Sequence, residues 1–205
     1  MTVFPVTDGF AAEIGDIDLS ITLSAADRAE LEAAFNCYSV LVFPDQHLST
    51  DQHLEFARNF GPLETTIHAA RSDAQLRVRA EISDVSNLDP DEAIWGEKSR
   101  KRMFEMGNRM WHTDSSFRRL PAKASLLYSR SIPPVGGQTE FADMRQFVYT
   151  HRWREHDLVM WDNRCTMHRG KGYDDLRWPR DMQRATVSDV APTCEQEGIK
   201  VPATA

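Results

Sequence analysis

The stretch Trp111-His112-Thr113-Asp114 is the one around which the rest of the chain can be arranged. In an extended strand, side chains two apart point to the same side, so we expect His112 and Asp114 to project together. A second histidine facing them, for which His168 is the best candidate, would complete the two-histidine, one-carboxylate set that holds Fe(II) on one octahedral face. The opposite face would stay open for a chelating co-substrate and dioxygen. Alone, an H-x-D pattern is a weak signal, because it is more often a surface pair.

Composition places the chain among ordinary globular proteins. Its 205 residues are 41% hydrophobic and 27% charged, which is enough for one domain with a core. The net charge of -7 argues against broad binding to nucleic acid or to an anionic membrane. The sequence shows neither a signal peptide nor a run of ~18 apolar residues, and the three cysteines are odd in number and widely spaced. We therefore expect one cytoplasmic domain over 1–205 with reduced thiols, and a homo-oligomer stays open.

Two helices are predicted before residue 64. Their N-terminal caps are Ser24 with Asp27, and Ser49 with Gln52. The apolar positions expected to face the core are Leu31, Ala34 and Phe35 in the first helix and Leu54, Ala57 and Phe60 in the second. Residues 38–43 form an apolar run between the helices and predict a buried strand. We interpret this opening as framework.

Residues 64–110 are less regular, with one predicted strand over 81–86. The segment 89–105 mixes charges with bulky apolar side chains and carries a basic cluster, formed by Lys98, Arg100, Lys101 and Arg102. Two interpretations stay open for this segment. Charge runs are usually solvated loops, but a mobile lid could offer positive charge to an anionic substrate.

From Met110 onward, short strands alternate with turns. The predicted strands cover 111–117, 124–130, 138–141, 147–153, 158–161 and 165–168, followed by one on which Arg180, Met182 and Arg184 face the same way. Many short strands after an α/β opening indicate an α+β protein with a double-stranded β-helix, or jelly roll, and flanking N-terminal helices. The mouth of such a fold can present ligands from several strands.

Six blocks of the sequence also occur together in one known family. The blocks are Ser39–Phe43, Phe56–Glu64, Trp111–Phe117, Gly136–Arg145, Asp157–Gly170 and Arg180–Thr186. In this order they resemble the taurine dioxygenase and 2,4-dichlorophenoxyacetate dioxygenase (TauD/TfdA) family of Fe(II)/2-oxoglutarate enzymes. Within that family the resemblance is strongest to the phenoxyacetate (aryloxyalkanoate) branch, and it covers most of the chain.

The resemblance implies a role for each matching position. His112, Asp114 and His168 match the metal ligands and catalytic centre of the family. Thr139 and Arg180 match the residues that bind the carboxylates of 2-oxoglutarate, and Arg184 matches a second arginine near the anionic end of co-substrate or substrate. A guanidinium suits bidentate carboxylate binding. Taken singly, the arginines could be surface ion-pair partners, Thr139 a β-former and His168 a core histidine.

The activity implied is hydroxylation of a small organic acid coupled to decarboxylation of 2-oxoglutarate, with Fe(II) and O₂. On an aryloxyalkanoate, hydroxylation next to the ether oxygen would lead to cleavage to a phenol and an oxo acid. Alternatives are a sulfonate or sulfate-ester dioxygenase of the same family, a non-catalytic jelly-roll binding protein, and a zinc hydrolase with the same ligands. Three neighbours of the ligands could orient them: Asn163, Trp111 and Trp161. The two tryptophans are more typical of a core.

The spacing between the two histidines departs from the family. Only 56 positions separate His112 from His168, and the family has a longer segment there. Arg145 runs almost directly into a block that resembles the approach to the second histidine. We therefore expect a missing segment at about 145–146, and a spatial gap between Arg145 and Gln146 wider than the ~3.8 Å of adjacent Cα atoms.

Overall fold

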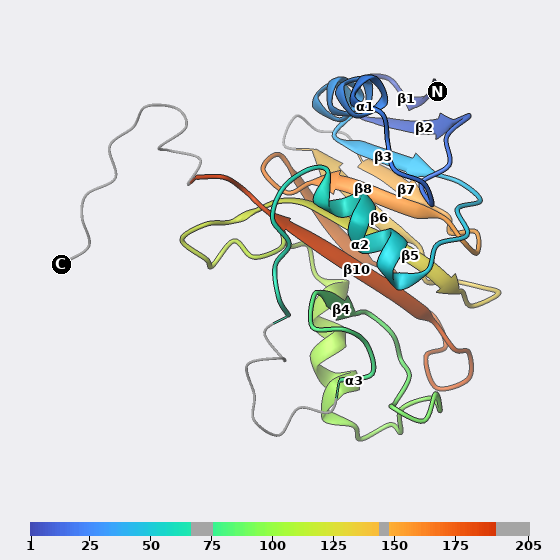
Figure 1. Cartoon of the computed structure of the whole chain (residues 1–205). Helices are drawn as coiled ribbons and strands as arrows, with labels where there is room; N and C mark the ends of the chain where they lie inside the picture. Colours follow the sequence, from blue (N-terminus) through green and yellow to red (C-terminus); the bar gives the residue numbers. More distant parts are fainter. Residues whose placement is uncertain (67–75, 144–147, 192–205) are drawn as a thin grey trace.

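The computed structural model describes residues 1–66, 76–143 and 148–191 (Figure 1). The described residues form ten strands: β1 (Thr2–Thr7), β2 (Ala11–Gly15), β3 (Val40–Phe43), β4 (Ile82–Asp84), β5 (Ala122–Ser131), β6 (Thr139–Asp143), β7 (Val148–His151), β8 (Leu158–Asp162), β9 (Thr166–Gly170) and β10 (Asp181–Ser188). The helices are α1 (Ala25–Tyr38), α2 (Thr50–Arg58), α3 (Arg100–Glu105) and a 3-10 turn over Met106–Arg109.

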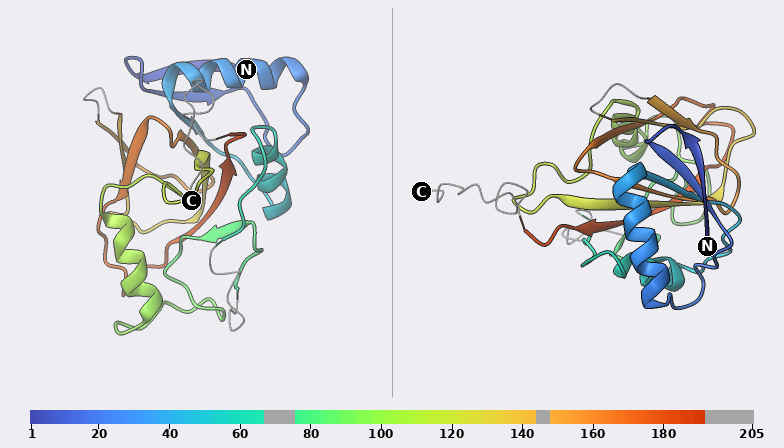
Figure 2. Two further views of the ribbon diagram at one scale, coloured as in Figure 1. Left: turned by 90° about the vertical axis from the view of Figure 1, so that its left-hand side faces the viewer. Right: turned by 90° about the horizontal axis from the view of Figure 1, so that it is seen from above.

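The strands form two sheets. The larger has the order β1-β2-β3-β8-β5-β10-β4, and only its β2–β3 pair is parallel. The smaller has the order β7-β6-β9 and is antiparallel throughout. Seen from above, α1 and α2 lie on one side of the larger sheet and the smaller sheet on the other (Figure 2).

Alternating side chains of the central strands divide between two cores. Leu41 and Phe43 of β3 pack in the cluster that includes the buried faces of α1 and α2. Val40 and Val42 pack in a second cluster with Phe141 of the smaller sheet. Because successive side chains of a strand point to opposite faces, a sheet covered on both sides needs continuous apolar runs. The uninterrupted apolar sequence of β3 therefore follows from its position between two layers.

Both predicted helix caps are confirmed. Ser24 accepts a hydrogen bond from the Asp27 N–H, and Ser49 with Gln52 forms a complete capping box. All six apolar positions predicted to face the core are buried. The predicted strand at 38–43 starts later, because Tyr38 ends α1 and Ser39 terminates it in the left-handed region at φ 59°.

One prediction for the middle of the chain is wrong. The segment 111–117 is not a strand, since only His112 within it makes a bridge. The segment 89–105, for which a solvated loop and a lid were both left open, consists of turns and one bridge up to residue 99 and ends in α3. Two cations of its basic cluster are already paired: Lys101 with Asp84 at 2.8 Å, and Arg102 with Asp175 at 3.0 Å.

Other expectations meet the structure in part. Cys37 is a free, exposed thiol and the Cys165 thiol contacts Ser39 Oγ at 3.4 Å, whereas Cys194 lies outside the described residues. So does the gap predicted between Arg145 and Gln146. Within the described ranges, no helix has the length and apolar character needed to cross a membrane.

Candidate metal centre and anion site

A two-stranded main-chain bridge holds the two candidate histidines side by side. The His112 N–H donates to the His168 carbonyl oxygen at 3.0 Å, and the His168 N–H donates back at 2.8 Å. Their imidazole rings lie 4.2 Å apart between centroids. His168 belongs to β9, which pairs with β6, so the smaller sheet positions both histidines.

Asp114 completes the cluster predicted from the sequence. Its Oδ1 lies 3.9 Å from His112 Nε2, and its Oδ2 lies 3.8 Å from His168 Nε2. One donor atom from each residue falls within 4.8 Å of the others, and among the described residues no other such group is found. The structure therefore brings together the three residues that the H-x-D pattern and the distant histidine suggested.

The protonation of the cluster suits a divalent cation. Burial lowers the pKa of His168 to about 3, so this imidazole is neutral. His112 Nδ1 lies 2.9 Å from the Met110 carbonyl oxygen, so Nδ1 is the donor in this contact and Nε2 is the atom that faces the cluster as a possible ligand. Burial is the largest influence on Asp114 and acts to raise its pKa, but Arg184, the two histidines and the Ser125 hydrogen bond together hold that pKa below its usual range. Two imidazoles and an ionised carboxylate form a donor set that fits a first-row divalent metal.

Arg184 lies at this cluster. Its Nη1 is 2.6 Å from Asp114 Oδ1, and the side chains are 18% and 6% exposed. Its Nε is buried without a hydrogen-bond partner among the described residues. Arg184 thus balances the charge of Asp114 and retains an N–H for a further anion.

Arg180 immediately precedes β10 and is buried, and its hydrogen-bond partners differ from those of Arg184. Its Nη1 donates to the Val85 carbonyl oxygen at 3.3 Å, and its Nε has no partner among the described residues. No carboxylate of the described ranges forms an ion pair with it, and burial lowers its pKa. Its neighbours Tyr173 and Glu105 have pKa values raised by burial to about 12 and about 7. Below neutral pH this guanidinium therefore has no ionised counter-ion.

Thr139 is the first residue of β6 and follows Gly137, which lies against Arg180. A Cβ on Gly137, two residues earlier, would be 3.6 Å from Arg180 Nε. Thr139 Oγ1 accepts a hydrogen bond from Trp153 Nε1 at 3.0 Å. Because an indole only donates, the hydroxyl proton of Thr139 remains available for another acceptor.

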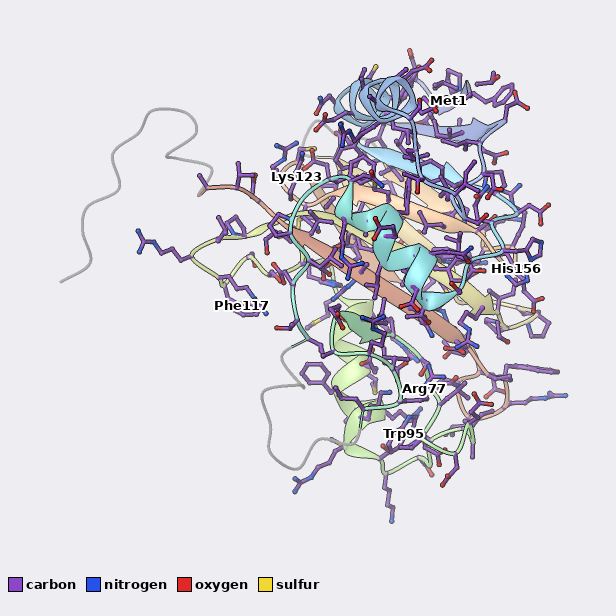
Figure 3. The ribbon with its side chains drawn as sticks, in the orientation of Figure 1. Met1, Arg77, Trp95, Phe117, Lys123 and His156 are labelled. Carbon is purple, nitrogen blue, oxygen red and sulfur yellow. The ribbon has the colours of Figure 1, made fainter. Side chains whose placement is uncertain are left out.

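Two adjoining hollows connect these groups. One, of about 250 Å³, is lined by His112, Asp114, Arg184 and the aromatic rings of Phe104 and Phe117. The other is lined by Arg180 and Tyr173. Val85, Glu105 and Asn108 line both, so they stand between the metal cluster and Arg180. Trp95 and Arg77 lie in the part of the molecule that contains β4 and α3, and Phe117 lies on the loop to the left of that part (Figure 3).

Several residues of the site were missed by sequence reasoning. They are Ser125, which hydrogen-bonds Asp114, Trp153 beside Thr139, and Tyr173 and Glu105 beside Arg180. Ser125 had a readable signal, because it is a polar residue inside the apolar run 124–128. Glu105 had none, since it is a single carboxylate in a segment that mixes charges with apolar residues.

Comparison with known proteins gives a consistent result. The sequence matches the family described as "Taurine catabolism dioxygenase TauD, TfdA family" over residues 2–148 and 145–186. It is 30% identical to the alpha-ketoglutarate-dependent 2,4-dichlorophenoxyacetate dioxygenase of Cupriavidus pinatubonensis over 280 positions, covering 91% of this chain and 97% of the relative. It is 37% identical to an (S)-phenoxypropionate/alpha-ketoglutarate-dioxygenase of Sphingobium herbicidovorans, covering 70% of this chain and 45% of that one.

Solved structures share the fold. The crystal structure of AAD-2 in complex with Mn(II) and N-oxalylglycine superposes with a TM-score of 0.84 and 31% identity, covering 94% of this chain and 99% of that chain. A taurine dioxygenase from Burkholderia xenovorans superposes with a TM-score of 0.73 and 18% identity, covering 93% and 92%. The second likeness bears on the fold alone.

Proposed function

Because the chain belongs to the taurine catabolism dioxygenase TauD, TfdA family, we propose that it is an Fe(II)- and 2-oxoglutarate-dependent dioxygenase that hydroxylates an aryloxyalkanoate such as 2,4-dichlorophenoxyacetate. The observation that carries this proposal is the pairing of two unlike sites in one cleft. A cluster of two imidazoles and an ionised carboxylate adjoins a buried arginine that has no carboxylate hydrogen-bonded to it among the described residues. A metal and a dicarboxylic 2-oxo acid together would satisfy both.

The reaction uses both atoms of dioxygen. One enters 2-oxoglutarate, which loses CO₂ and becomes succinate. The other enters the C–H bond next to the ether oxygen of the aryloxyalkanoate, and the resulting hemiacetal breaks down to a phenol and an oxo acid. Fe(II), which we assign to His112, Asp114 and His168, would supply the activation of dioxygen and of the 2-oxo acid.

The remaining side chains bind and orient. We assign the distal carboxylate of 2-oxoglutarate to Arg180, with the free hydroxyl proton of Thr139 as a second donor. Arg184 keeps Asp114 ionised and offers its unpartnered N–H to an anionic group beside the metal. The rings of Phe104 and Phe117, on the same hollow, suit an aryl group.

We also propose that the chain is one jelly-roll domain with a shortened interior. The family matches in two pieces that meet at residues 145–148, and the alignment with the Cupriavidus enzyme runs over 280 positions for a chain of 205 residues. Both observations support a missing segment at about 145–146. A cytoplasmic location, the lack of nucleic-acid or membrane partners and the oligomeric state stay predictions from composition.

The test is a substrate panel with the purified protein, Fe(II), 2-oxoglutarate and O₂. Succinate and phenol are measured with phenoxyacetates, phenoxypropionates, alkyl sulfonates and sulfate esters. We expect phenol and succinate in equal amounts with an aryloxyalkanoate, and neither without iron or 2-oxoglutarate. Succinate formation driven only by sulfonates or sulfate esters would move the enzyme to another branch. No oxygen consumption with any acid would overturn the dioxygenase assignment.

A further inference from the structure

A buried chain of hydrogen bonds leads from Trp161 to the carboxylate of Asp114. Its links are Trp161 Nε1 to Asn163 Oδ1 at 3.0 Å, Asn163 Nδ2 to Ser125 Oγ at 2.9 Å, and Ser125 Oγ to Asp114 Oδ2 at 2.7 Å. We propose that this relay fixes the orientation of the Asp114 carboxylate and thereby sets the metal affinity of the centre, with Ser125 as the positioning residue. The inference rests on the metal role proposed for Asp114, and it is independent of the substrate.

The direction of every hydrogen bond in the relay follows from its first member. An indole N–H can only donate, so the atom of Asn163 that faces Trp161 must be the amide oxygen. The amide nitrogen then faces Ser125 and donates to it. Since the Ser125 oxygen already accepts one hydrogen bond, its own proton points to Asp114 Oδ2. The polarity is therefore set by Trp161 and does not depend on the charge state of the metal centre.

Asn163 also supplies hydrogen bonds to the segment around Asp114, which at that residue has no strand of the described chain to pair with. The Asp114 N–H donates to Asn163 Oδ1 at 3.3 Å, and Thr113 Oγ1 donates to the Asn163 carbonyl oxygen at 2.8 Å. Only His112 of this segment makes a bridge to a neighbouring strand. The tight turn after β8 thus holds both the main chain and the side chain of Asp114.

The relay restricts rotation of the Asp114 carboxylate, a movement that would turn its oxygens away from the metal position. Asp114 carries Ser125 on one carboxylate oxygen and Arg184 on the other, so the group cannot rotate about its terminal bond without losing two charge-assisted hydrogen bonds. Ser125 and Trp161 are 0% exposed, so water does not replace either donor. Groups that orient a ligand in this way change metal affinity by about 10- to 100-fold when removed.

The same strand offers a matched control for Ser125. Ser129 lies four residues later on β5, is also 0% exposed, and donates to the Arg154 carbonyl oxygen at 2.6 Å. It has no link to Asp114. Ser125→Ala and Ser129→Ala therefore remove equally buried hydroxyls from one strand, and only the first touches the relay.

The experiment measures Mn(II) binding to the full chain by the loss of the free-ion electron paramagnetic resonance signal, without co-substrate. We expect Ser125→Ala to weaken Mn(II) binding by about 10- to 100-fold and Ser129→Ala by less than about two-fold, with similar shifts in melting temperature. Trp161→Phe, which keeps the ring but removes the N–H, should give an intermediate loss and serves if Ser125→Ala does not fold.

The outcomes separate the inference from the function on which it rests. If the wild-type protein binds Mn(II) and both Ser125→Ala and Trp161→Phe bind it equally well, the relay is overturned and the metal centre stands. If Ser129→Ala weakens binding as much as Ser125→Ala, the effect is structural and the relay is again overturned. A wild-type protein that does not bind Mn(II) overturns the metal centre and the relay together.

Discussion

The Asp114 end of the cleft and the Arg180 end differ in how their charges are balanced. Asp114 has a guanidinium at 2.6 Å on one oxygen and a hydroxyl at 2.7 Å on the other. Arg180 has a carbonyl oxygen at 3.3 Å and a buried N–H with no partner among the described residues. The two arginines are only four residues apart, Arg180 just before β10 and Arg184 within it, so their difference comes from the groups that surround each of them.

This contrast indicates which parts of the site are complete before ligands bind. A buried charge without a partner costs several kcal/mol, and a protein retains one where a ligand later supplies the partner. The Asp114 end is fixed in advance, as a metal site needs. The Arg180 end awaits an anion, as a carboxylate site needs.

The largest effect is expected from removing a metal ligand. In His168→Ala the cluster keeps one imidazole and one carboxylate, so Mn(II) affinity should fall by more than about 100-fold, beyond the effect of residues that only orient ligands. Succinate formation should fall below detection. His156→Ala, which changes a histidine of the β7–β8 turn that hydrogen-bonds Tyr128, is the control. Turnover retained in His168→Ala would place the metal elsewhere.

Arg180→Met tests the unbalanced end. The change removes the expected partner of the distal carboxylate, so N-oxalylglycine affinity should fall by about 30-fold or more, the usual effect of truncating a buried charged pair. The free energy of unfolding should stay unchanged or rise, because an unpaired buried cation is lost. Titration calorimetry of the Mn(II)-loaded protein and thermal unfolding measure the two effects. Lower stability without loss of affinity would contradict the contrast.

Arg184→Met tests the Asp114 end of the cleft. Unlike Arg180→Met, it should lower the free energy of unfolding. The change leaves the buried Asp114 carboxylate without its guanidinium, which costs about 3–5 kcal/mol when a buried pair is broken. The value for this pair should lie near the lower limit, since the Arg184 side chain is 18% exposed. Thermal unfolding without metal gives the measurement, and added Mn(II) should restore part of the loss. Equal stabilities for Arg184→Met and Arg180→Met would remove the distinction between the two ends.

A smaller, pH-dependent effect is expected at Glu105. Burial raises the pKa of this carboxyl from 4.5 to about 7, so the folded protein keeps a proton between those values that the unfolded chain has released. The free energy of unfolding therefore falls as pH rises from about 4.5 to 7, by up to about 3 kcal/mol, and is then constant.

Glu105→Gln keeps the shape of the side chain and cannot ionise. Its melting temperature should match that of the wild type near pH 4.5 and exceed it at pH 8. A difference in melting temperature that is the same at both pH values would show that Glu105 ionises normally, and that Arg180 then has an anionic neighbour at neutral pH.

The sequence predicted the framework well wherever the signal was local. The caps at Ser24 and Ser49 satisfy helix N–H groups a few residues away, and the apolar run of β3 records burial on both faces. The clustering of His112, Asp114 and His168 was also predicted, although His168 is distant in sequence, because its block resembles a known family. The caps and the β3 strand depend on neighbouring residues, and the His168 prediction depends on a sequence block shared with the family.

The misses have physical causes of another kind. The segment 111–117 has a strand-like composition, but its polar side chains bond to Asn163 and Glu64, and Ser115 adopts φ 53°. The helix α3 leaves its apolar residues Met103 and Phe104 exposed, so it has no apolar face to detect. The ion pair of Arg184 with Asp114 joins residues 70 positions apart. Such contacts follow from the folded arrangement and leave no local pattern.

Because β10 is paired on both sides, its position affects which length of co-substrate the site accepts. The strand pairs with β5 on one side and β4 on the other, and Arg180 just before it exchanges hydrogen bonds with Asn87, at 2.7 and 3.2 Å. The main-chain separation of Arg180 and Arg184, ~13 Å for four extended residues, cannot stretch or shorten. If Arg180 and the metal cluster hold the two ends of the co-substrate as proposed, β10 fixes the distance between them, and a diacid one methylene shorter or longer would reach only one of the two.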